Sequence, residues 1–392
     1  MMHNNYKELG VSENKDLRIA IFMPYAWLSY TVTIIEAIEV FLGKGYEVDI
    51  VQAYSDEYPI FKFNDTRVSV YYYTWGPGRT FLQVITRKMR FLFSSFMACH
   101  KKKYKYLFGI DAEGLIIAWL MNFFLKAPII YYSLELYLSK DNPWKNNSID
   151  SFLYSFRKKL ERIANAKAVY TITQNEYRVK ALSEDNGIKE DRVIILPYAP
   201  RGHYVVSDHK WWHKKFNIPE HKKIILHLGS ITDWYYSREL ANAALSWPDE
   251  WVLVFHGKTY ISIESIIEKS KGRIFISNEW IAYNQLDKLI ASADIGIALY
   301  KNIDYNHFST SSGKLSYYLR CGVPVVAQKF PALEELVDRH KCGICVNDVR
   351  EIKMAIDNIL LNYQEYSFNA KKVFSEHLDF NKFFPEVLKK LQ

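Results

Sequence analysis

The chain has 392 residues, of which 49% are hydrophobic and 24% charged, with 16 glycines and 12 prolines. This composition excludes disordered and fibrous proteins, and the length suits two hydrophobic cores better than one. The formal net charge of +8 favours anionic partners, such as nucleotide phosphates, acidic phospholipids or nucleic acid. Nucleic acid is not expected, because no recognised binding motif accompanies the charge.

The sequence shows no targeting signal or membrane span. Residues 1–14 are polar and lack the apolar core of a signal peptide, so we expect a cytoplasmic protein. The longest nearly apolar stretch, residues 115–125, is shorter than the roughly 20 residues needed to cross a bilayer. Cys342 and Cys345 have the spacing of a metal or redox pair, but no second pair completes a zinc site. We therefore interpret both cysteines as structural.

Short apolar segments alternate with helical patterns along the first half of the chain, which predicts a parallel sheet with crossover helices. Strands are expected at residues 18–23, 47–53, 68–73, 106–110, 129–133 and 168–173. Helices are expected at residues 33–42, 115–125 and 148–165, with a further long helical stretch before residue 106.

A second series of the same kind follows a Pro-flanked change in composition near residues 200–220. Its strands are expected at residues 224–228, 251–256, 273–276, 295–299 and 323–328. Its helices are expected at residues 237–245, 264–269, 284–292, 314–321 and 333–338, with amphipathic helix from 349 to 392. The fold class predicted is α/β, with two Rossmann-like, doubly wound domains at residues 1–203 and 204–375. A final helix, residues 376–392, is expected to pack back on the first domain. Ligands in such sheets bind beyond the carboxyl ends of the strands.

A polar loop at residues 305–312 leads into the predicted helix that Gly322 ends. Ser311, Ser312 and Gly313 fall where a helix N-terminus presents unpaired N–H groups, and Lys314 adds a cation. Together these groups are suited to bind a phosphate. The alternative is a plain serine-capped helix.

Residues 305–327 resemble the donor-binding signature of family-4-like GT-B glycosyltransferases, in which a loop and a helix precede a Gly-x-Pro-Val-Val turn, here at residues 322–326. The string Ser-Ser-Gly-Lys-Leu at 311–315 resembles a bacterial polysaccharide-assembly branch of that group. Three further segments are similar to parts of the family's nucleotide domain. Residues 225–230 are similar to its first strand and turn, and residues 252–258 to the strand that ends in a phosphate-side turn. Residues 279–298 are similar to its base-binding loop with the next helix and strand. The strong resemblance covers about residues 220–346.

The resemblance implies a GT-B fold, with the acceptor on the side of residues 1–203 and a nucleotide-sugar on the side of residues 204–375. It implies retaining sugar transfer, from a donor that is most commonly UDP-linked to a glycan or lipid-linked saccharide, without a metal or other cofactor. The donor-binding residues expected are Gly229, Ser230, His256, Lys258, Glu279, Trp280, Ser309, Ser311, Ser312, Gly313, Lys314 and Tyr317. His256 has a structural alternative, because a lone histidine is more often satisfied within a fold.

The sequence departs from the family pattern at three positions. The family motif has two glutamates eight positions apart, and here Ser309 and Tyr317 occupy those positions. Ser230 stands at the position of the usual diphosphate-binding arginine, while Lys258 matches the usual lysine. The missing glutamates keep open a catalytically silent protein that binds a nucleotide-sugar or glycan. A nucleotide-sugar epimerase, which shares the two-domain architecture, is the enzymatic alternative.

Three carboxylates of the first half follow predicted strands and are candidate catalytic residues: Asp111, Glu113 and Glu135. At these positions they are expected to contact the sugar or the acceptor. For Asp111 and Glu113, the alternative is a helix cap and a dipole partner, since a helix is expected to begin at Leu115.

Residues 87–104 interleave cations with aromatic side chains. A helix of this kind can lie on anionic lipid at the inner face of the membrane, where a lipid-linked acceptor is found. The alternative is a core-facing helix with a solvated basic rim.

Overall fold

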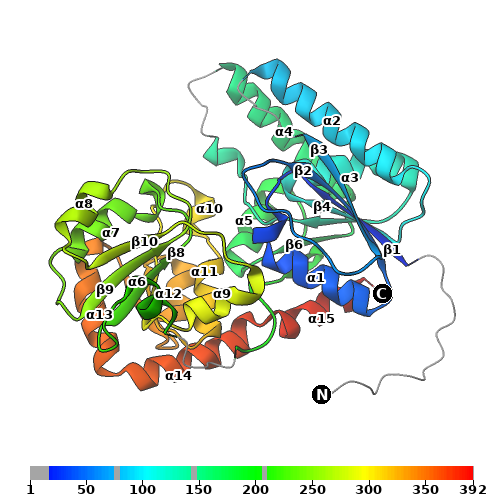
Figure 1. The fold of residues 1–392 in the computed structure, drawn as a ribbon. Helices are drawn as coiled ribbons and strands as arrows, with labels where there is room; N and C mark the ends of the chain where they lie inside the picture. The colour runs from blue at the N-terminus through cyan, green and yellow to red at the C-terminus, as the bar shows by residue number, and fades with distance from the viewer. Residues whose placement is uncertain (1–16, 75–79, 143–147, 205–209, 392) are drawn as a thin grey trace, which may run out of the picture. The chain divides into compact units, whose positions relative to one another are not determined.

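The computed structural model of the protein describes residues 17–74, 80–142, 148–204 and 210–391. The polar residues 1–14, on which the expected location depends, lie outside this part of the chain. The described residues form two sheets with helices around them, as the predicted α/β class requires (Figure 1).

The first sheet has seven strands among the described residues, in the order β3-β2-β1-β4-β5-β6-β7. The strands are β1 (Arg18–Met23), β2 (Glu47–Tyr54), β3 (Val68–Thr74), β4 (Tyr106–Ile110), β5 (Ile129–Tyr132), β6 (Tyr170–Thr173) and β7 (Val193–Ile195). The pairs from β3 through β5 are parallel. Apart from its first residue, β1 is buried throughout, because a parallel sheet is covered on both faces.

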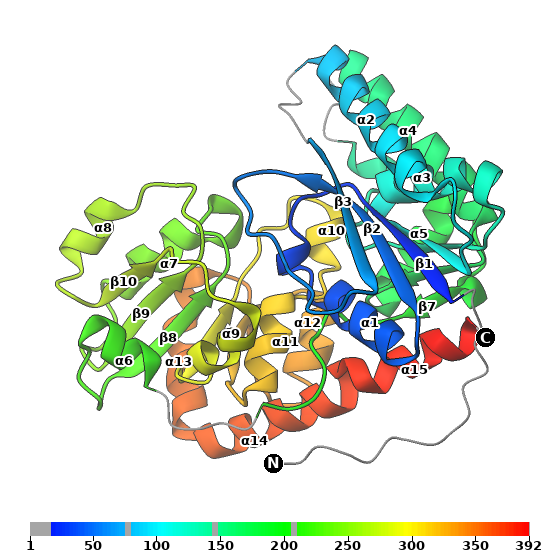
Figure 2. The same ribbon diagram turned by 45° about the vertical axis from the view of Figure 1, so that its right-hand side comes forward.

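The helices of this half of the chain are α1 (Val32–Gly43), α2 (Phe81–Cys99), α3 (Asp111–Leu125), α4 (Ser148–Lys167) and α5 (Glu176–Asn186). Short 3-10 turns lie at η1 (Leu28–Tyr30), η2 (Ser139–Asp141) and η3 (Glu190–Arg192). The helices α2 and α3 pack side by side and contact strands of the first sheet (Figure 2). Gly114 permits the close approach of α3 to β1, since a Cβ there would lie 2.2 Å from the carbonyl oxygen of Phe22.

The second sheet has six strands among the described residues, in the order β10-β9-β8-β11-β12-β13, and its pairs are parallel. The strands are β8 (Lys223–Leu228), β9 (Trp251–His256), β10 (Ile274–Ser277), β11 (Ile295–Ala298), β12 (Val325–Gln328) and β13 (Gly343–Val346). The α-helices are α6 (Trp211–Phe216), α7 (Ser237–Ala244), α8 (Glu264–Lys269), α9 (Tyr283–Ile290), α10 (Tyr305–Phe308), α11 (Gly313–Arg320), α12 (Pro331–Val337), α13 (Ile352–Leu361), α14 (Tyr363–Val373) and α15 (Phe380–Lys390). Shorter turns are η4 (Asp233–Tyr235), η5 (Val349–Glu351) and the π-helical η6 (Phe374–Leu378).

Two hydrophobic clusters hold this second sheet among its helices. One contains side chains of α9, α11, α12 and α14, with Trp212 and Tyr318 fully buried at its centre. The other contains side chains of α7, α8 and α13 around Phe255 and Trp251. Both clusters include strand residues, so the sheet buries side chains on each of its faces.

The chain divides into two compact units by its internal contacts. Unit 1 is the described part of residues 1–28, 37–133 and 156–171. Unit 2 is the described part of residues 29–36, 134–155 and 172–392. Unit 2 therefore takes up several segments from the first half of the sequence, including the one that follows β5. The helix α15 packs against β7 within unit 2.

The strands expected from the sequence are confirmed, with differences of one or two residues at their ends. The elements missed include α5, β7, α6 and α10. All four are short or polar, so their apolar periodicity is weak. In the described residues, no helix is both long enough and apolar enough to cross a membrane.

Candidate functional site

Two turns meet at the carboxyl ends of β8 and β9. The register pairs Leu228 with His256, and the backbone N–H of Gly229 donates to the carbonyl oxygen of His256 at 2.8 Å. Gly257 has a φ of +152°, and a Cβ there would lie 2.2 Å from the carbonyl oxygen of Gly229. Only glycine fits at this position. The two backbones consequently hold Ser230 and Lys258 at one edge of the sheet.

The N-terminus of α11 carries the serine cap expected from the sequence. The Ser312 side chain accepts a hydrogen bond from the backbone N–H of Leu315 at 3.2 Å. The Ser316 hydroxyl donates to the carbonyl oxygen of Tyr198 at 2.7 Å, and the Tyr198 ring lies against Gly313. Ser311 accepts from the Tyr198 backbone N–H at 3.5 Å. The segment around Tyr198 thus fixes the first turn of α11.

Lys314 follows this cap and brings a cation into a buried position. Its Nζ is shielded from solvent and has no hydrogen-bond partner among the described residues. The Nζ lies 3.8 Å from the centroid of the Tyr235 ring and 4.8 Å from that of Tyr300. A Cβ placed on Gly229 would lie 3.8 Å from it. Burial lowers the pKa of Lys314 from 10.5 to about 7. An ammonium without an anion is unfavourable in such a place, and an arriving phosphate would relieve it.

The histidines of β8 and β9 are buried and held by the fold. Burial, and then the nearby charge of Lys314, lower the pKa of His227 to about 3. His256 contacts the Ser277 hydroxyl through Nδ1 at 3.1 Å, its ring lies near Trp212, and burial lowers its pKa to about 4. These contacts favour the structural alternative for His256.

The loop before α11 is anchored by an arginine that the sequence analysis did not identify. The Nε of Arg178, on α5, donates to the Ser309 carbonyl oxygen at 3.1 Å. Its Nη1 donates to the Leu134 carbonyl oxygen at 2.6 Å, and its Nη2 to Oδ1 of Asn306 at 2.5 Å. The Arg178 side chain is almost fully buried. The start of α5 could have been predicted from Asn175, which caps it, and its end from Gly187.

The two positions of the absent family glutamates are both buried. Ser309 donates through its hydroxyl to the carbonyl oxygen of Tyr305 at 2.7 Å. Tyr317 belongs to the hydrophobic cluster of α11. Neither position supplies an exposed carboxylate.

The expected base-binding loop follows β10 in unit 2. Glu279 forms an ion pair with Lys215 of α6. The neighbouring Trp280 is 52% exposed, so its indole ring is available to a planar ligand. Lys258 is exposed, with its Nζ 5.3 Å from the centroid of the Tyr260 ring.

The three candidate catalytic carboxylates are divided between the two units. Glu135 is exposed and lies in unit 2, where its Oε2 accepts from Nδ2 of Asn306 at 2.6 Å. Burial, and then the charge of Glu135, raise the pKa of Tyr235, the tyrosine whose ring faces Lys314. Asp111 and Glu113 belong to unit 1.

The expected start of α3 was wrong. The helix begins at Asp111 rather than at Leu115, and the residue in the cap position is Ile110. Asp111 is buried and has a φ of +53°, and Glu113 forms an ion pair with Lys88 at 3.5 Å. Asp111 therefore does not act as the N-cap, although both carboxylates lie in the first turn, where the helix dipole favours them.

Within the described ranges, no group of three or more His, Cys, Asp or Glu side chains is arranged to hold a metal. The Cys342 thiol donates to the carbonyl oxygen of Leu336 at 3.5 Å, and burial raises the pKa of this thiol to about 12. Cys345 lies in strand β13.

Comparisons with known proteins identify the fold. Residues 263–391 match the family model described as glucosyltransferase 3-like, C-terminal domain. A chitobiosyldiphosphodolichol beta-mannosyltransferase of Candida albicans is 22% identical over 213 residues, which is 49% of this chain and 44% of that protein. The chain thus spans less than half the length of that curated relative.

Two solved structures are similar over almost the whole chain. Sucrose-phosphate synthase from Thermosynechococcus elongatus has a TM-score of 0.75 and 14% identity, covering 95% of this chain and 98% of that one. The Anabaena protein HepE, in complex with UDP-glucose, has a TM-score of 0.69 and 13% identity, covering 95% and 99%. The described residues share the GT-B fold of these two structures, and the C-terminal third of the chain matches a family model of glucosyltransferases. The predicted GT-B fold and family resemblance are confirmed.

Proposed function

We propose that the protein transfers a sugar from a nucleotide-sugar donor to an acceptor hydroxyl, with the donor diphosphate bound at the N-terminus of α11. The observation that carries the proposal is the buried ammonium of Lys314, which has no hydrogen-bond partner among the described residues. It lies beside the turn of Gly229 and one residue into a serine-capped helix. A helix N-terminus, a cation and a glycine turn together favour a phosphate ligand.

The chemistry proposed for this arrangement is stabilisation of the leaving group. The bond between the anomeric carbon and the β-phosphate oxygen breaks, and its electron pair stays on the diphosphate. The acceptor oxygen bonds the anomeric carbon, and its proton passes to the leaving β-phosphate oxygen. Lys314, Lys258 and the backbone N–H groups at residues 311–313 neutralise the charge that develops on the diphosphate. Because these groups carry the charge, we propose that transfer needs no metal, and the family resemblance favours retention of configuration.

We also propose a chemical class for the donor and for the acceptor. A UDP-linked hexose is favoured by the resemblance and by the fold shared with HepE, which binds UDP-glucose. Trp280 is the proposed stacking partner of the base, and Glu135 the proposed carboxylate contact to sugar or acceptor. The acceptor class proposed is a glycan or lipid-linked saccharide. A cytoplasmic location with peripheral contact to the inner membrane face accords with the net charge of +8.

The test is a calorimetric and thermal-shift screen against UDP, GDP, ADP and CMP, with and without EDTA, followed by turnover assays. Selective stabilisation by one nucleotide that EDTA leaves unchanged supports a metal-free donor site. Sugar transfer that requires an acceptor supports the glycosyltransferase. Conversion of the nucleotide-sugar without acceptor indicates an epimerase, and binding without turnover indicates a silent binding protein. No response to any nucleotide contradicts the proposal.

A further inference from the structure

An apolar stripe runs along the outer face of α2 in unit 1. Its side chains are between 40% and 72% exposed and recur every three or four residues, which places them on one face of the helix: Leu82, Ile85, Met89, Phe93 and Met97. The opposite face of the helix buries Phe91, Ser95 and Cys99. The core-facing alternative is thus correct for one face of α2, but it leaves the exposed apolar stripe unexplained.

The apolar surface continues from α2 onto α3. The rings of Phe96 on α2 and Phe124 on α3 lie edge to face, with their centroids 5.4 Å apart. The rings of Trp119 and Phe123 on α3 are 5.7 Å apart. Phe123 and Phe124 are both exposed. We call this continuous region, the stripe of α2 with these α3 aromatics, the α2–α3 surface.

The charged side chains of α2 and of the turn that follows it are all cations. Residues 82–103 contain six cations and no Asp or Glu, and the side chains of Arg90, Lys101 and Lys103 are exposed. Lys102 differs from its neighbours, because its Nζ donates to Oδ1 of the buried Asp49 and to the Tyr71 hydroxyl, both at 2.8 Å. Lys102 is therefore tied to the fold, while Arg90, Lys101 and Lys103 are exposed to solvent.

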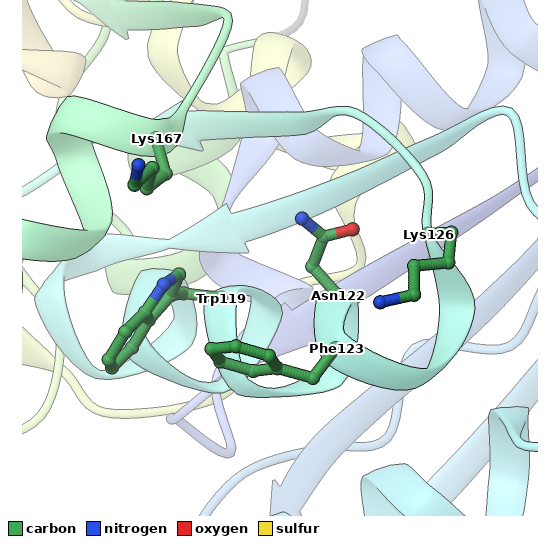
Figure 3. A pocket seen from close by; sticks show the side chains of 5 residues that line it. All are labelled: Trp119, Asn122, Phe123, Lys126 and Lys167. Carbon is green, nitrogen blue, oxygen red and sulfur yellow. The ribbon is translucent and has the colours of Figure 1, made fainter.

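A pocket of about 290 Å³ lies at the edge of the same surface, between the C-terminal ends of α3 and α4. It is lined by Trp119, Asn122, Phe123, Lys126 and Lys167. Figure 3 shows the two rings side by side on α3, with Lys126 at the end of that helix and Lys167 coming from α4. The five lining residues include two cations and no carboxylate, which suits an anionic group.

We propose that unit 1 docks on an anionic membrane surface through the α2–α3 surface, with the pocket holding a lipid phosphate. An exposed apolar face flanked by cations is the pattern of helices that lie in the membrane interface. A tryptophan with an apolar body and a polar N–H suits the headgroup level, and long lysine side chains reach the phosphates. Charge complementarity favours lipid over a second copy of this chain, which would bring like charges together. The proposal does not rest on sugar transfer.

The test is sedimentation of the full chain with phosphatidylcholine vesicles, prepared with and without phosphatidylglycerol. The triple variant Arg90→Gln/Lys101→Gln/Lys103→Gln is expected to lower the partition coefficient on anionic vesicles on the order of 100-fold, from roughly fivefold per cation. A higher salt concentration should also weaken the binding of the unaltered chain to anionic vesicles. The matched control, Lys269→Gln/Lys372→Gln/Lys389→Gln, removes equal charge from exposed positions of unit 2 and should retain binding within about threefold.

Two further variants separate the apolar stripe from the pocket. Met89→Ser/Phe93→Ser removes apolar area without changing charge and should weaken binding at least tenfold. Lys126→Gln/Lys167→Gln should weaken it about 25-fold on anionic vesicles. Thermal unfolding checks that each variant remains folded. Equal loss in the unit 2 control, or no preference for anionic vesicles, overturns the proposal. So does a dimer in sedimentation velocity that the Met89→Ser/Phe93→Ser variant dissociates while vesicle binding is unchanged.

Discussion

The Nζ of Lys314 lies 3.8 Å from the centroid of the Tyr235 ring, so the cation faces an aromatic ring where a counter-ion would be expected. The ring attracts the ammonium, but this attraction stabilises the charge less than full hydration by water would. No hydrogen-bond acceptor for Nζ is present among the described residues. Lys314 should consequently lower the stability of the free protein while raising its affinity for an anionic ligand.

Replacement of Lys314 by methionine tests both effects. Lys314→Met keeps the aliphatic stem and removes the buried charge, so the free energy of unfolding should rise by roughly 1–3 kcal/mol. Loss of a charge-assisted hydrogen bond to phosphate should weaken UDP binding about 10- to 100-fold. Denaturant unfolding and calorimetry measure the two quantities. The matched control is Lys301→Met, because Lys301 is paired with Glu239 at 2.8 Å, and it should lower stability without weakening UDP binding. Unchanged UDP affinity in Lys314→Met would place the diphosphate elsewhere.

The same lysine should make donor binding depend on pH. The pKa of Lys314 is about 7 in the free protein, so the side chain loses its proton as pH rises above 7. A bound diphosphate favours the protonated form, and binding should therefore take up a proton. The affinity for a UDP-sugar should fall as pH rises from 7 to 9, by at most about tenfold per unit. Calorimetry in buffers of different ionisation enthalpy measures the uptake directly, and Lys314→Met should abolish it.

Stability of the free protein should change with pH in the opposite sense. The unfolded chain, with an ordinary lysine pKa of 10.5, binds the proton more tightly than the folded chain, with a pKa of about 7. The free energy of unfolding should rise between those two values, by at most about 1.4 kcal/mol per pH unit from this group. Denaturant unfolding of the protein and of Lys314→Met, compared at several pH values, isolates the contribution. A difference between the two that does not vary with pH would contradict the low pKa.

The local parts of the site could be predicted from sequence, and the tertiary parts could not. The Ser312 cap and the turn at Gly322, which has a φ of +71°, follow from residue types in adjacent positions. The cage of Tyr235 and Tyr300 around Lys314 joins residues far apart in the chain, and no spacing reveals it. The start of α3 was misplaced because Asp111 enters the helix with a positive φ. Aspartate adopts such a φ more readily than most residues, but no sequence motif indicates it here. The roles of the donor-binding residues stay predictions.

Arg178 should be a positioning residue for the loop that precedes α11. Its removal in Arg178→Ala leaves the carbonyl oxygens of Leu134 and Ser309 without these donors. We expect a loss of about 2–4 kcal/mol in the free energy of unfolding, together with weaker UDP binding. Arg178→Lys keeps the charge without the planar fork and should recover part of both. The control Arg339→Ala, at an exposed position of unit 2, should change stability by less than about 0.5 kcal/mol. Lost stability with unchanged UDP affinity would show that Arg178 supports the fold alone.

Glu135 should affect turnover more than donor binding. Its carboxylate is exposed, accepts from Asn306 at 2.6 Å, and lies in unit 2 with the Lys314 cage. Glu135→Gln keeps an acceptor for Asn306 and removes only the charge. Because a negative charge near a diphosphate opposes its binding, UDP affinity should stay equal or rise slightly, while kcat falls about 10- to 100-fold through loss of a contact to sugar or acceptor.

The comparison variants for Glu135 are the two carboxylates of unit 1. Asp111→Asn preserves a residue type that tolerates a positive φ, and Glu113→Gln releases an ion pair with Lys88. Single-turnover and steady-state assays with a UDP-sugar and acceptor rank the three. If Glu135→Gln has the largest effect on kcat, the acting carboxylate belongs to the unit that carries Lys314. A larger effect from Asp111→Asn, at equal stability, would instead assign the acceptor contact to the start of α3, and Glu135 would then serve to hold Asn306 beside Arg178.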